Sequence, residues 1–186
     1  FFECDSLKSA TIGNGLVEIG TGPFASCDLL MSINVAAENQ EYVSQDGVLF
    51  NKALTQLIQA PGAKSGDYNI PNSVTIIGDD AFYDCRSLTS VTIPNGTSAI
   101  GDNAFFACTK LSSLNIPANI TLIGDSAFVF CLSLRSISIP ASVKTIGSGS
   151  FADCRSLKTV TLTEGVTMIG RSAFFGCDSL KRVTIP

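Results

Sequence analysis

The side chains with the greatest chemical potential are the seven cysteines, at positions 4, 27, 85, 108, 131, 154 and 177. A thiolate can act as a nucleophile or a metal ligand, and a cysteine in such a role has surroundings that set it apart. Here five cysteines occur in nearly the same local sequence: "FYDC", "FFAC", "FVFC", "FADC" and "FFGC". This recurrence indicates a repeated structural position rather than one reactive site.

The residues that would assist cysteine or serine chemistry are missing. The chain has no histidine, which removes the commonest general base and the commonest metal ligand together. Neither the repeated positions nor the remaining segments combine a nucleophile with a base. We therefore expect no enzymatic activity, no catalytic residue and no cofactor.

Aspartates form a second recurring set, because Asp79, Asp102 and Asp125 each directly follow an Ile-Gly pair. Carboxylates in a row are ligands for hard cations, which raises the hypothesis of a calcium site. However, no D-x-D-x-D spacing accompanies them, and each lies where a short polar side chain can cap the turn that follows. Capping is the favoured interpretation, and we predict no metal site.

These residues belong to a repeat of 23 residues. Five of the six intervals between cysteines are 23 residues and one is 58. The last five units follow the consensus I-G-x-x-A-F-x-x-C-x-x-L-x-x-[VIL]-x-I-P, with Thr163 in place of the proline in one unit. Apolar residues separated by one polar residue, as in Val91 and Ile93, predict a short strand with one buried face. Pro94 and its equivalents end this strand because proline cannot donate to a ladder. The A-F-x-x-C segment predicts one helical or 3₁₀ turn that directs Phe and Cys inward.

One such unit cannot bury its own core, so the units must stack into a solenoid. We predict a right-handed α/β solenoid with a parallel sheet along one face and one buried cysteine per coil. Equivalent side chains in neighbouring coils lie about 4.8 Å apart, farther than the Cβ separation of about 3.8 Å that a disulfide needs. Their number is also odd. Free buried thiols are therefore favoured over disulfides.

The units "IGDDAFYDCRSLTSVTIP", "IGDNAFFACTKLSSLNIP" and "IGDSAFVFCLSLRSISIP" resemble the BspA-like class of leucine-rich repeats, and the resemblance covers essentially the whole chain. It implies a leucine-rich-repeat solenoid with its parallel sheet on the concave face and short helical or 3₁₀ turns on the convex side. It also implies a non-catalytic protein-binding or adhesion module of a cell-surface or secreted protein, with a host or extracellular-matrix protein as partner. The chain has no polar capping unit at either end, so we expect residues 1–186 to form a single solenoid domain of a larger protein.

An irregular insert at about residues 36–70 breaks the period. Alternation in residues 48–50 and 56–60 predicts a β-hairpin. Residues 58–61 can be aligned with residues 91–94, which would make the hairpin part of an irregular coil, followed by a loop and a short strand. The insert either contacts a partner or is a variant coil, and the variant coil is favoured because loops vary whether or not they bind anything.

The outward side of the predicted sheet, here called the sheet face, is almost uncharged except for one cluster. Two outward columns hold Ser, Thr or Asn at thirteen of fourteen positions, and these columns together with the residues that begin each strand contain no acidic residue but 5 of the 12 basic ones. The cluster, here called the basic patch, consists of Arg135, Ser136, Lys158, Thr159, Lys181 and Arg182. Hydroxyls and cations there would attract an acidic protein or an anionic glycan. The alternative is that strand preference alone enriches threonine and depletes Asp and Glu.

Composition limits the other function classes. A net charge of −4 and a pI near 4.7 argue against a nucleic-acid partner, which needs a basic surface. No apolar run approaches eighteen residues, so this segment is not expected to insert into a membrane. A binding module is the leading hypothesis, and a structural spacer that displays other domains is the alternative. An ice-binding solenoid is a remote alternative, based on T-x-T-like rows such as "TVT" at residue 159.

Overall fold

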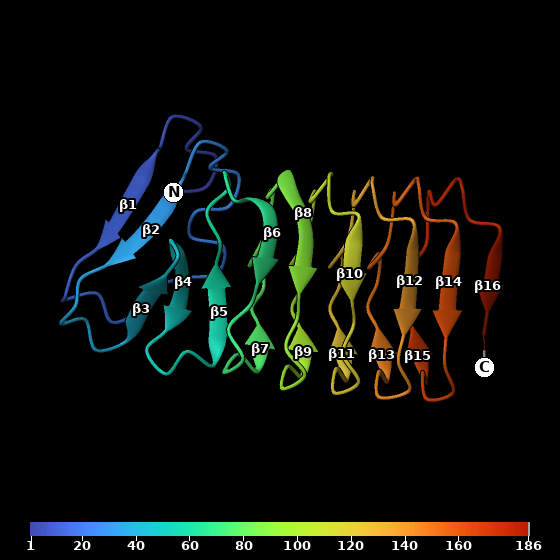
Figure 1. Ribbon diagram of the computed structural model, residues 1–186. Coiled ribbons are helices and arrows are strands. Elements are labelled where there is room, and N and C mark those ends of the chain that lie inside the picture. The colour runs from blue at the N-terminus through green and yellow to red at the C-terminus, as the bar shows by residue number, and fades with distance from the viewer. Residues whose placement is uncertain (186) are drawn as a thin grey trace.

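The computed structural model describes residues 1–185, in which sixteen strands and no helix of any type are present. The strands follow one another along a single axis from the N-terminal end to the C-terminal end (Figure 1). Within the described residues there is no helix long and apolar enough to cross a membrane. The predicted stack of coils with parallel strands is confirmed, and the predicted helical or 3₁₀ turns are wrong.

The sheet face is built from one strand per coil, and its paired strands are parallel. Val91 and Ile93 are buried, while Thr92 between them is exposed. Ser138 is likewise exposed between two buried isoleucines. This is the alternation that a half-buried strand requires. The strands are β1 (Ser9–Ile12), β2 (Ser32–Val35), β6 (Ser65–Asn69), β8 (Ser87–Thr92), β10 (Ser113–Asn115), β12 (Ser136–Ile139), β14 (Thr159–Leu162) and β16 (Arg182–Thr184).

Hydrogen bonding divides the sheet face into three ladders. The strand orders are β1-β2, β10-β8-β6 and β12-β14-β16. Strands β10 and β12 are therefore neighbours along the stack, as Figure 1 shows, without a shared ladder. The last ladder keeps the sequence period, since Ser136 pairs with Thr159 and Thr159 pairs with Arg182.

A second sheet of eight strands runs beside the first, and the sequence pattern did not predict it. Its regular part consists of two-residue strands that end at the isoleucine of each Ile-Gly pair, and Ile77, Ile100, Ile123 and Ile146 are fully buried. The strands are β3 (Tyr42–Gln45), β4 (Val48–Asn51), β5 (Gln56–Gln59), β7 (Ile76–Ile77), β9 (Ala99–Ile100), β11 (Leu122–Ile123), β13 (Thr145–Ile146) and β15 (Met168–Ile169).

The A-F-x-x-C segment forms a series of turns that bond to the next coil. The Phe82 amide donates to the Ala104 carbonyl at 2.7 Å, and the Phe105 amide donates to the Ala127 carbonyl at 2.7 Å. A helix needs these amides for bonds within its own turn. Residues with positive φ, such as Asp80 at 56° and Asp84 at 58°, also leave the right-handed helical region. The predicted helical turn therefore does not form.

The core is a column of stacked phenylalanines flanked by the buried strand residues. Successive rings are nearly parallel, with centroids 4.8 Å apart for Phe82 and Phe105 and 5.2 Å apart for Phe105 and Phe128. The column continues through Phe151 to Phe174. A smaller apolar cluster at the N-terminal end is separate from this main core and is composed of Ile12, Phe24, Cys27, Leu30, Ile33, Tyr42 and Leu49.

The insert forms the predicted hairpin, but its alignment with the repeat is different. Strands β4 and β5 pair antiparallel, and an additional hairpin joins β3 to β4. Strand β5 pairs with β7 so that Leu57 lies beside Ile77. The predicted alignment of residues 58–61 with residues 91–94 is therefore wrong. Tyr68 on β6 occupies that place instead, opposite Val91.

Candidate binding face

The six residues of the basic patch lie together at the C-terminal part of the sheet face. The Lys158 amide donates to the Arg135 carbonyl at 2.8 Å, and the Lys181 amide donates to the Lys158 carbonyl at 3.2 Å. These three cations therefore occupy neighbouring coils, about 4.8 Å apart along the stack. Ser136, Thr159 and Arg182 form the adjacent column in strict register.

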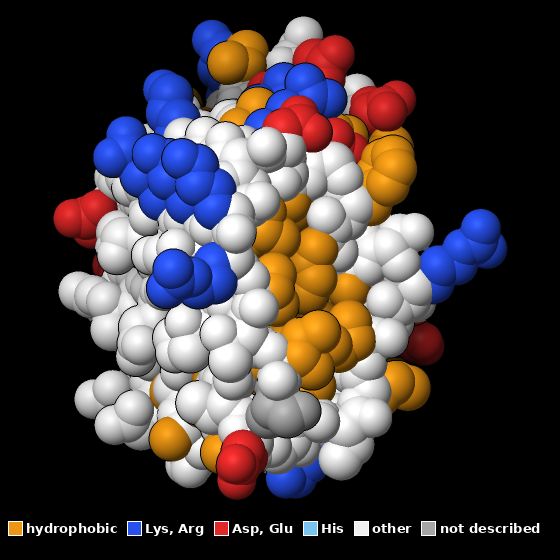
Figure 2. All heavy atoms as spheres, turned by 90° about the vertical axis from the view of Figure 1, so that its right-hand side faces the viewer, with side chains coloured by type: hydrophobic (Ala, Val, Ile, Leu, Met, Phe, Trp, Pro, Cys, Tyr) orange, Lys and Arg blue, Asp and Glu red, His pale blue; other side chains and the backbone are white. Residues whose placement is uncertain are grey.

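The basic patch is exposed and its charges are not neutralised within the described residues. All six of its residues are exposed, and within residues 1–185 none of their side chains makes a salt bridge or a hydrogen bond. The ion pairs that do form use Arg86 and Arg155. Figure 2 shows Lys and Arg side chains gathered along one side of the C-terminal end, beside an apolar area. Like charges at this spacing repel one another, so the patch favours an anionic ligand.

A hollow of about 570 Å³ adjoins the basic patch, lined by Lys110, Ser112, Ser133, Arg135 and Ser156. It lies where β10 and β12 fail to pair. The prediction from strand columns did not include Lys110, because this residue precedes its strand. The alternation of exposed Lys110, buried Leu111 and exposed Ser112 is the signal that places Lys110 on the same side as Ser112.

A coil near the middle of the sheet face carries an acidic residue. Asp67 on β6 lies opposite Ser90, and its carboxylate accepts a hydrogen bond from the Thr89 hydroxyl at 2.9 Å. The outward columns predicted from the sequence did not contain Asp67, because residues 58–61 and not β6 were aligned with residues 91–94. The sheet face is therefore polarised, with an acidic residue near its middle coils and cations toward its C-terminal end.

All seven cysteines are free, as predicted. The Cys108 thiol donates to the Phe82 carbonyl at 3.2 Å, and the Cys131 thiol donates to the Phe105 carbonyl at 3.3 Å. Burial raises the pKa of both thiols well above its ordinary value. They are thus protonated and inaccessible, which is the opposite of what a nucleophile or a metal ligand needs.

The aspartate column forms a ladder of caps between coils. Asp79 Oδ1 accepts from the Asp102 amide at 2.8 Å, and Asp102 Oδ1 accepts from the Asp125 amide at 2.8 Å. Asp125 continues the ladder by accepting from the Ser148 amide at 2.6 Å. The carboxylates accept backbone amides as caps do, but each amide belongs to the next coil, so the predicted capping of the aspartate's own turn is wrong. Among residues 1–185 no group of three or more His, Cys, Asp or Glu residues is arranged to hold a metal ion.

Comparison with known proteins gives a consistent result for the fold. The structure resembles a leucine rich cell surface protein from Faecalibacterium prausnitzii, with a TM-score of 0.89, 32% identity and 95% of this chain covered. It also resembles the pneumococcal vaccine antigen PcpA, with a TM-score of 0.87, 27% identity and 95% coverage. The chain spans 47% and 44% of these two proteins, less than half of each.

A third solved structure, a leucine-rich repeat protein from Eubacterium ventriosum, has a TM-score of 0.72 and 25% identity, and the match covers 97% of this chain and 61% of that one. No curated protein gives a significant match. The sequence profile of the BspA type leucine-rich repeat region matches residues 1–57 and 64–186 in six copies. With its stacked coils, phenylalanine column and buried repeat cysteines, this chain therefore belongs to the BspA-type leucine-rich repeat family.

Proposed function

We propose that the sheet face is a protein-binding surface with the basic patch as its principal contact. On this proposal the chain is a non-catalytic adhesion module of a protein that is displayed on a cell surface or secreted. The observation that carries it is the row Arg135, Lys158 and Lys181, three exposed cations on neighbouring coils that no acidic side chain within residues 1–185 neutralises. An acidic surface on a partner would relieve their mutual repulsion and would be steered toward them.

The relatives support the setting of this proposal. One solved relative is a leucine rich cell surface protein, and another is a vaccine antigen of a pathogenic bacterium. A host or extracellular-matrix protein is accordingly the proposed partner class. An anionic glycan is the second candidate, which the hollow between Lys110 and Arg135 favours, because serine hydroxyls line it and two cations border it.

The test measures binding of the chain to immobilised matrix proteins, mucins and heparin at low and physiological salt. The variant Arg135→Ser/Lys158→Ser/Lys181→Ser/Arg182→Ser is compared with Lys52→Ser/Lys144→Ser/Arg155→Ser/Arg171→Ser, which removes the same charge from exposed positions elsewhere. We expect the first variant to bind at least about tenfold more weakly at low salt and the second to bind nearly as well as the original. Equal loss in both variants would show only a net-charge effect. Unchanged binding in the first would contradict the proposal and favour the spacer.

A further inference from the structure

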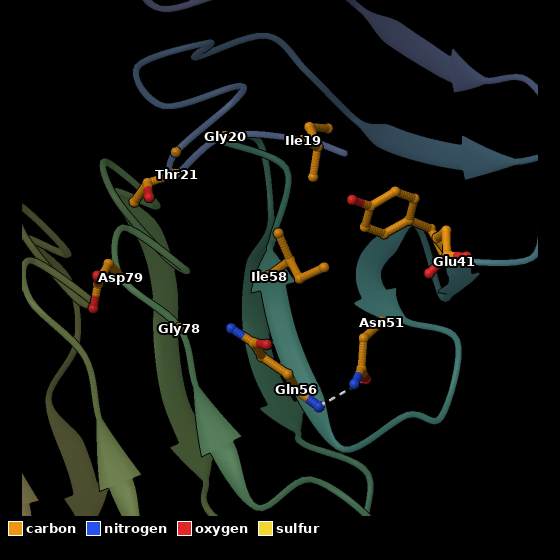
Figure 3. Close-up of a pocket in the computed structure, with 11 residues that line it drawn as sticks. Ile19, Gly20, Thr21, Glu41, Asn51, Gln56, Ile58, Gly78 and Asp79 are labelled. Atoms are coloured by element: carbon orange, nitrogen blue, oxygen red, sulfur yellow. Dashed lines mark hydrogen bonds between the residues drawn. The ribbon is translucent and has the colours of Figure 1, made fainter. Parts of the chain in front are cut away.

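A pocket of about 340 Å³ lies at the N-terminal end, far along the chain from the basic patch. Its walls come from the loop at residues 19–22, from the strands of the insert and from the turn after β7 (Figure 3). The regular coils follow a uniform 23-residue pattern, whereas this pocket depends on the insert. Pockets that hold small ligands have volumes of about 300 to 1,000 Å³, so this one suits a small molecule.

The insert changes the side chains that stand in the columns of the second sheet. Because Leu57 pairs with Ile77, Ile58 stands in the column that Gly78 and the other repeat glycines occupy. A glycine there packs tightly on the neighbouring coil, but Ile58 provides an apolar surface to the pocket, opposite Ile19. Gln56 stands beside Ile76 in the preceding column and also lines the pocket.

The pocket contains polar groups that make no hydrogen bond within the described residues. Asn51 is committed to the hairpin, since its Oδ1 accepts from the Thr55 and Gln56 amides at 2.9 Å (dashed line to Gln56 in Figure 3). Within residues 1–185, by contrast, the carboxylate of Glu41 and the carboxamide of Gln56 have no hydrogen-bond partner. Asp79 uses one carboxylate oxygen in the ladder to Asp102. The pocket therefore offers both acceptors and donors to a ligand.

The arrangement of these groups selects the class of ligand. Figure 3 shows Glu41 and Asp79 on opposite sides of the pocket, with Gln56 and Ile58 between them. A ligand that spans the pocket and carries many hydroxyls could meet both carboxylates, because each hydroxyl both donates and accepts hydrogen bonds, and the apolar faces of sugar rings would lie against Ile58 and Ile19. In the part of the chain that the structure describes, no group of three or more His, Cys, Asp or Glu residues is arranged to hold a metal ion.

We infer that this pocket binds a neutral saccharide of one or two rings. Glu41 and Asp79 accept from hydroxyls at the two ends of the ligand, the Gln56 carboxamide pairs with hydroxyls in the middle, and Ile58 packs against a ring face. Because the ligand carries no charge, its recognition does not depend on attraction between opposite charges. This site is independent of the sheet face, so either one can be present without the other.

The test uses saturation-transfer NMR with the chain and a panel of neutral disaccharides: lactose, maltose, cellobiose, N-acetyllactosamine and mannobiose. The sugar with the strongest signal is then titrated by calorimetry. Glu41→Ala and Gln56→Ala should each weaken binding about tenfold, as the loss of one hydrogen bond to a ligand does. The matched controls Glu38→Ala and Gln45→Ala change exposed residues outside the pocket and should bind like the original chain. Thermal unfolding of all four variants verifies that they are folded.

Three results would overturn the inference. One is the absence of a signal from every sugar in the panel, and another is equal binding by the pocket variants and the controls. The third is binding of N-acetyl-lysine amide or N-acetyl-arginine amide that weakens with added salt, in place of sugar binding. That result would assign the pocket to a basic side chain of a protein partner.

Discussion

The repeat cysteines contribute a hydrogen bond that a purely apolar side chain could not make. The Cys154 thiol donates to the Phe128 carbonyl at 3.1 Å, and Cys131 and Cys108 make the same contact one and two coils earlier. Burial holds these thiols in the protonated form that donation requires.

Asp80 is a different case, because its carboxylate is half-buried beside Gly22. Burial and the neighbouring carboxylates of Asp79 and Asp102 raise its pKa.

We expect Asp80→Asn to stabilise the fold at neutral pH. Asp80 has a higher pKa folded than unfolded, so the folded chain holds its proton more tightly and stability falls as pH rises above about 4. Asparagine carries no charge and tolerates the positive φ of 56° found here. Because about half of the side chain remains solvated and screened, the gain should be about 0.5 kcal/mol.

Urea unfolding of Asp80→Asn at several pH values measures this effect. The gain should shrink as the pH falls toward about 4 and should be absent below it, where the carboxyl is protonated in both states. Asp178→Asn, an exposed aspartate near the C-terminal end, controls for net charge. A gain that stays constant down to low pH would show that backbone conformation, and not the carboxylate, is responsible.

At the scale of elements, the fold depends on how closely one coil can approach the next. Gly101, Gly124 and Gly147 pack against the aspartate ladder of the coil before them. A Cβ atom on Gly124 would lie 2.5 Å from Asp102 Oδ1 and 2.6 Å from the Gly101 carbonyl carbon. Backbone atoms of Gly101 and Asp102 cannot move away, and Asp102 Oδ1 is held in the ladder by the Asp125 amide. The glycine of the Ile-Gly pair is therefore required by the spacing of the coils.

Gly124→Ala should destabilise the fold by about 1 to 3 kcal/mol, as overpacking of a close contact does. Gly96→Ala is the matched control, because its nearest atom, the Asn72 carbonyl oxygen, would lie 3.8 Å from the added Cβ. Its effect should stay within about 0.5 kcal/mol. Guanidinium unfolding of both variants provides the comparison, and similar losses from the two would contradict the close approach at residue 124.

The strands of the sheet face could be predicted because alternation of residues such as Val91, Thr92 and Ile93 directly encodes a half-buried strand. The second sheet could not, since each of its regular strands has two residues and only one of them points inward, which is too short for a period. The prediction of a helical turn in the A-F-x-x-C segment was wrong for a related reason. Whether the Phe82 amide bonds to its own turn or to Ala104 is decided by the neighbouring coil, which a local pattern does not contain.

The candidate binding face, like the fold, could be predicted only in part. Repeat columns located Arg135, Lys158 and Lys181 because every coil repeats the same geometry. Lys110 and Asp67 were missed, the first because it precedes a strand and the second because it belongs to the insert. The pocket at the N-terminal end is lined by segments that are far apart in the sequence, such as those that contain Ile19 and Asp79, and no repeat pattern predicts that they come together.

At the scale of the whole molecule, each coil is stabilised mainly by the two coils next to it. Central coils have neighbours on both sides, so Cys108 and Cys131 are fully buried. The terminal cysteines Cys4 and Cys177 are only partly buried. Opening of this chain should therefore begin at the less buried coils that contain Cys4 and Cys177.

This difference predicts a gradient of thiol reactivity in the native protein. With N-ethylmaleimide at pH 8, Cys4 and Cys177 should react first, and Cys108 and Cys131 should react at least about tenfold more slowly because they require larger opening. Their raised pKa also lowers the thiolate fraction. Peptide mapping by mass spectrometry measures each rate, and labelling in denaturant gives the rate for exposed thiols. Equal native rates at Cys131 and Cys177 would mean that the stack opens as one unit.

The ladders that join the coils also determine how the molecule responds to force. Their hydrogen bonds run from coil to coil, parallel to the axis of the stack, so tension between the two ends loads these bonds lengthwise and in series. The coils should then detach one at a time. Each regular coil of 23 residues would release about 80 Å of extended chain. Under stretching, the solenoid should therefore lengthen in equal steps, one for each coil that detaches.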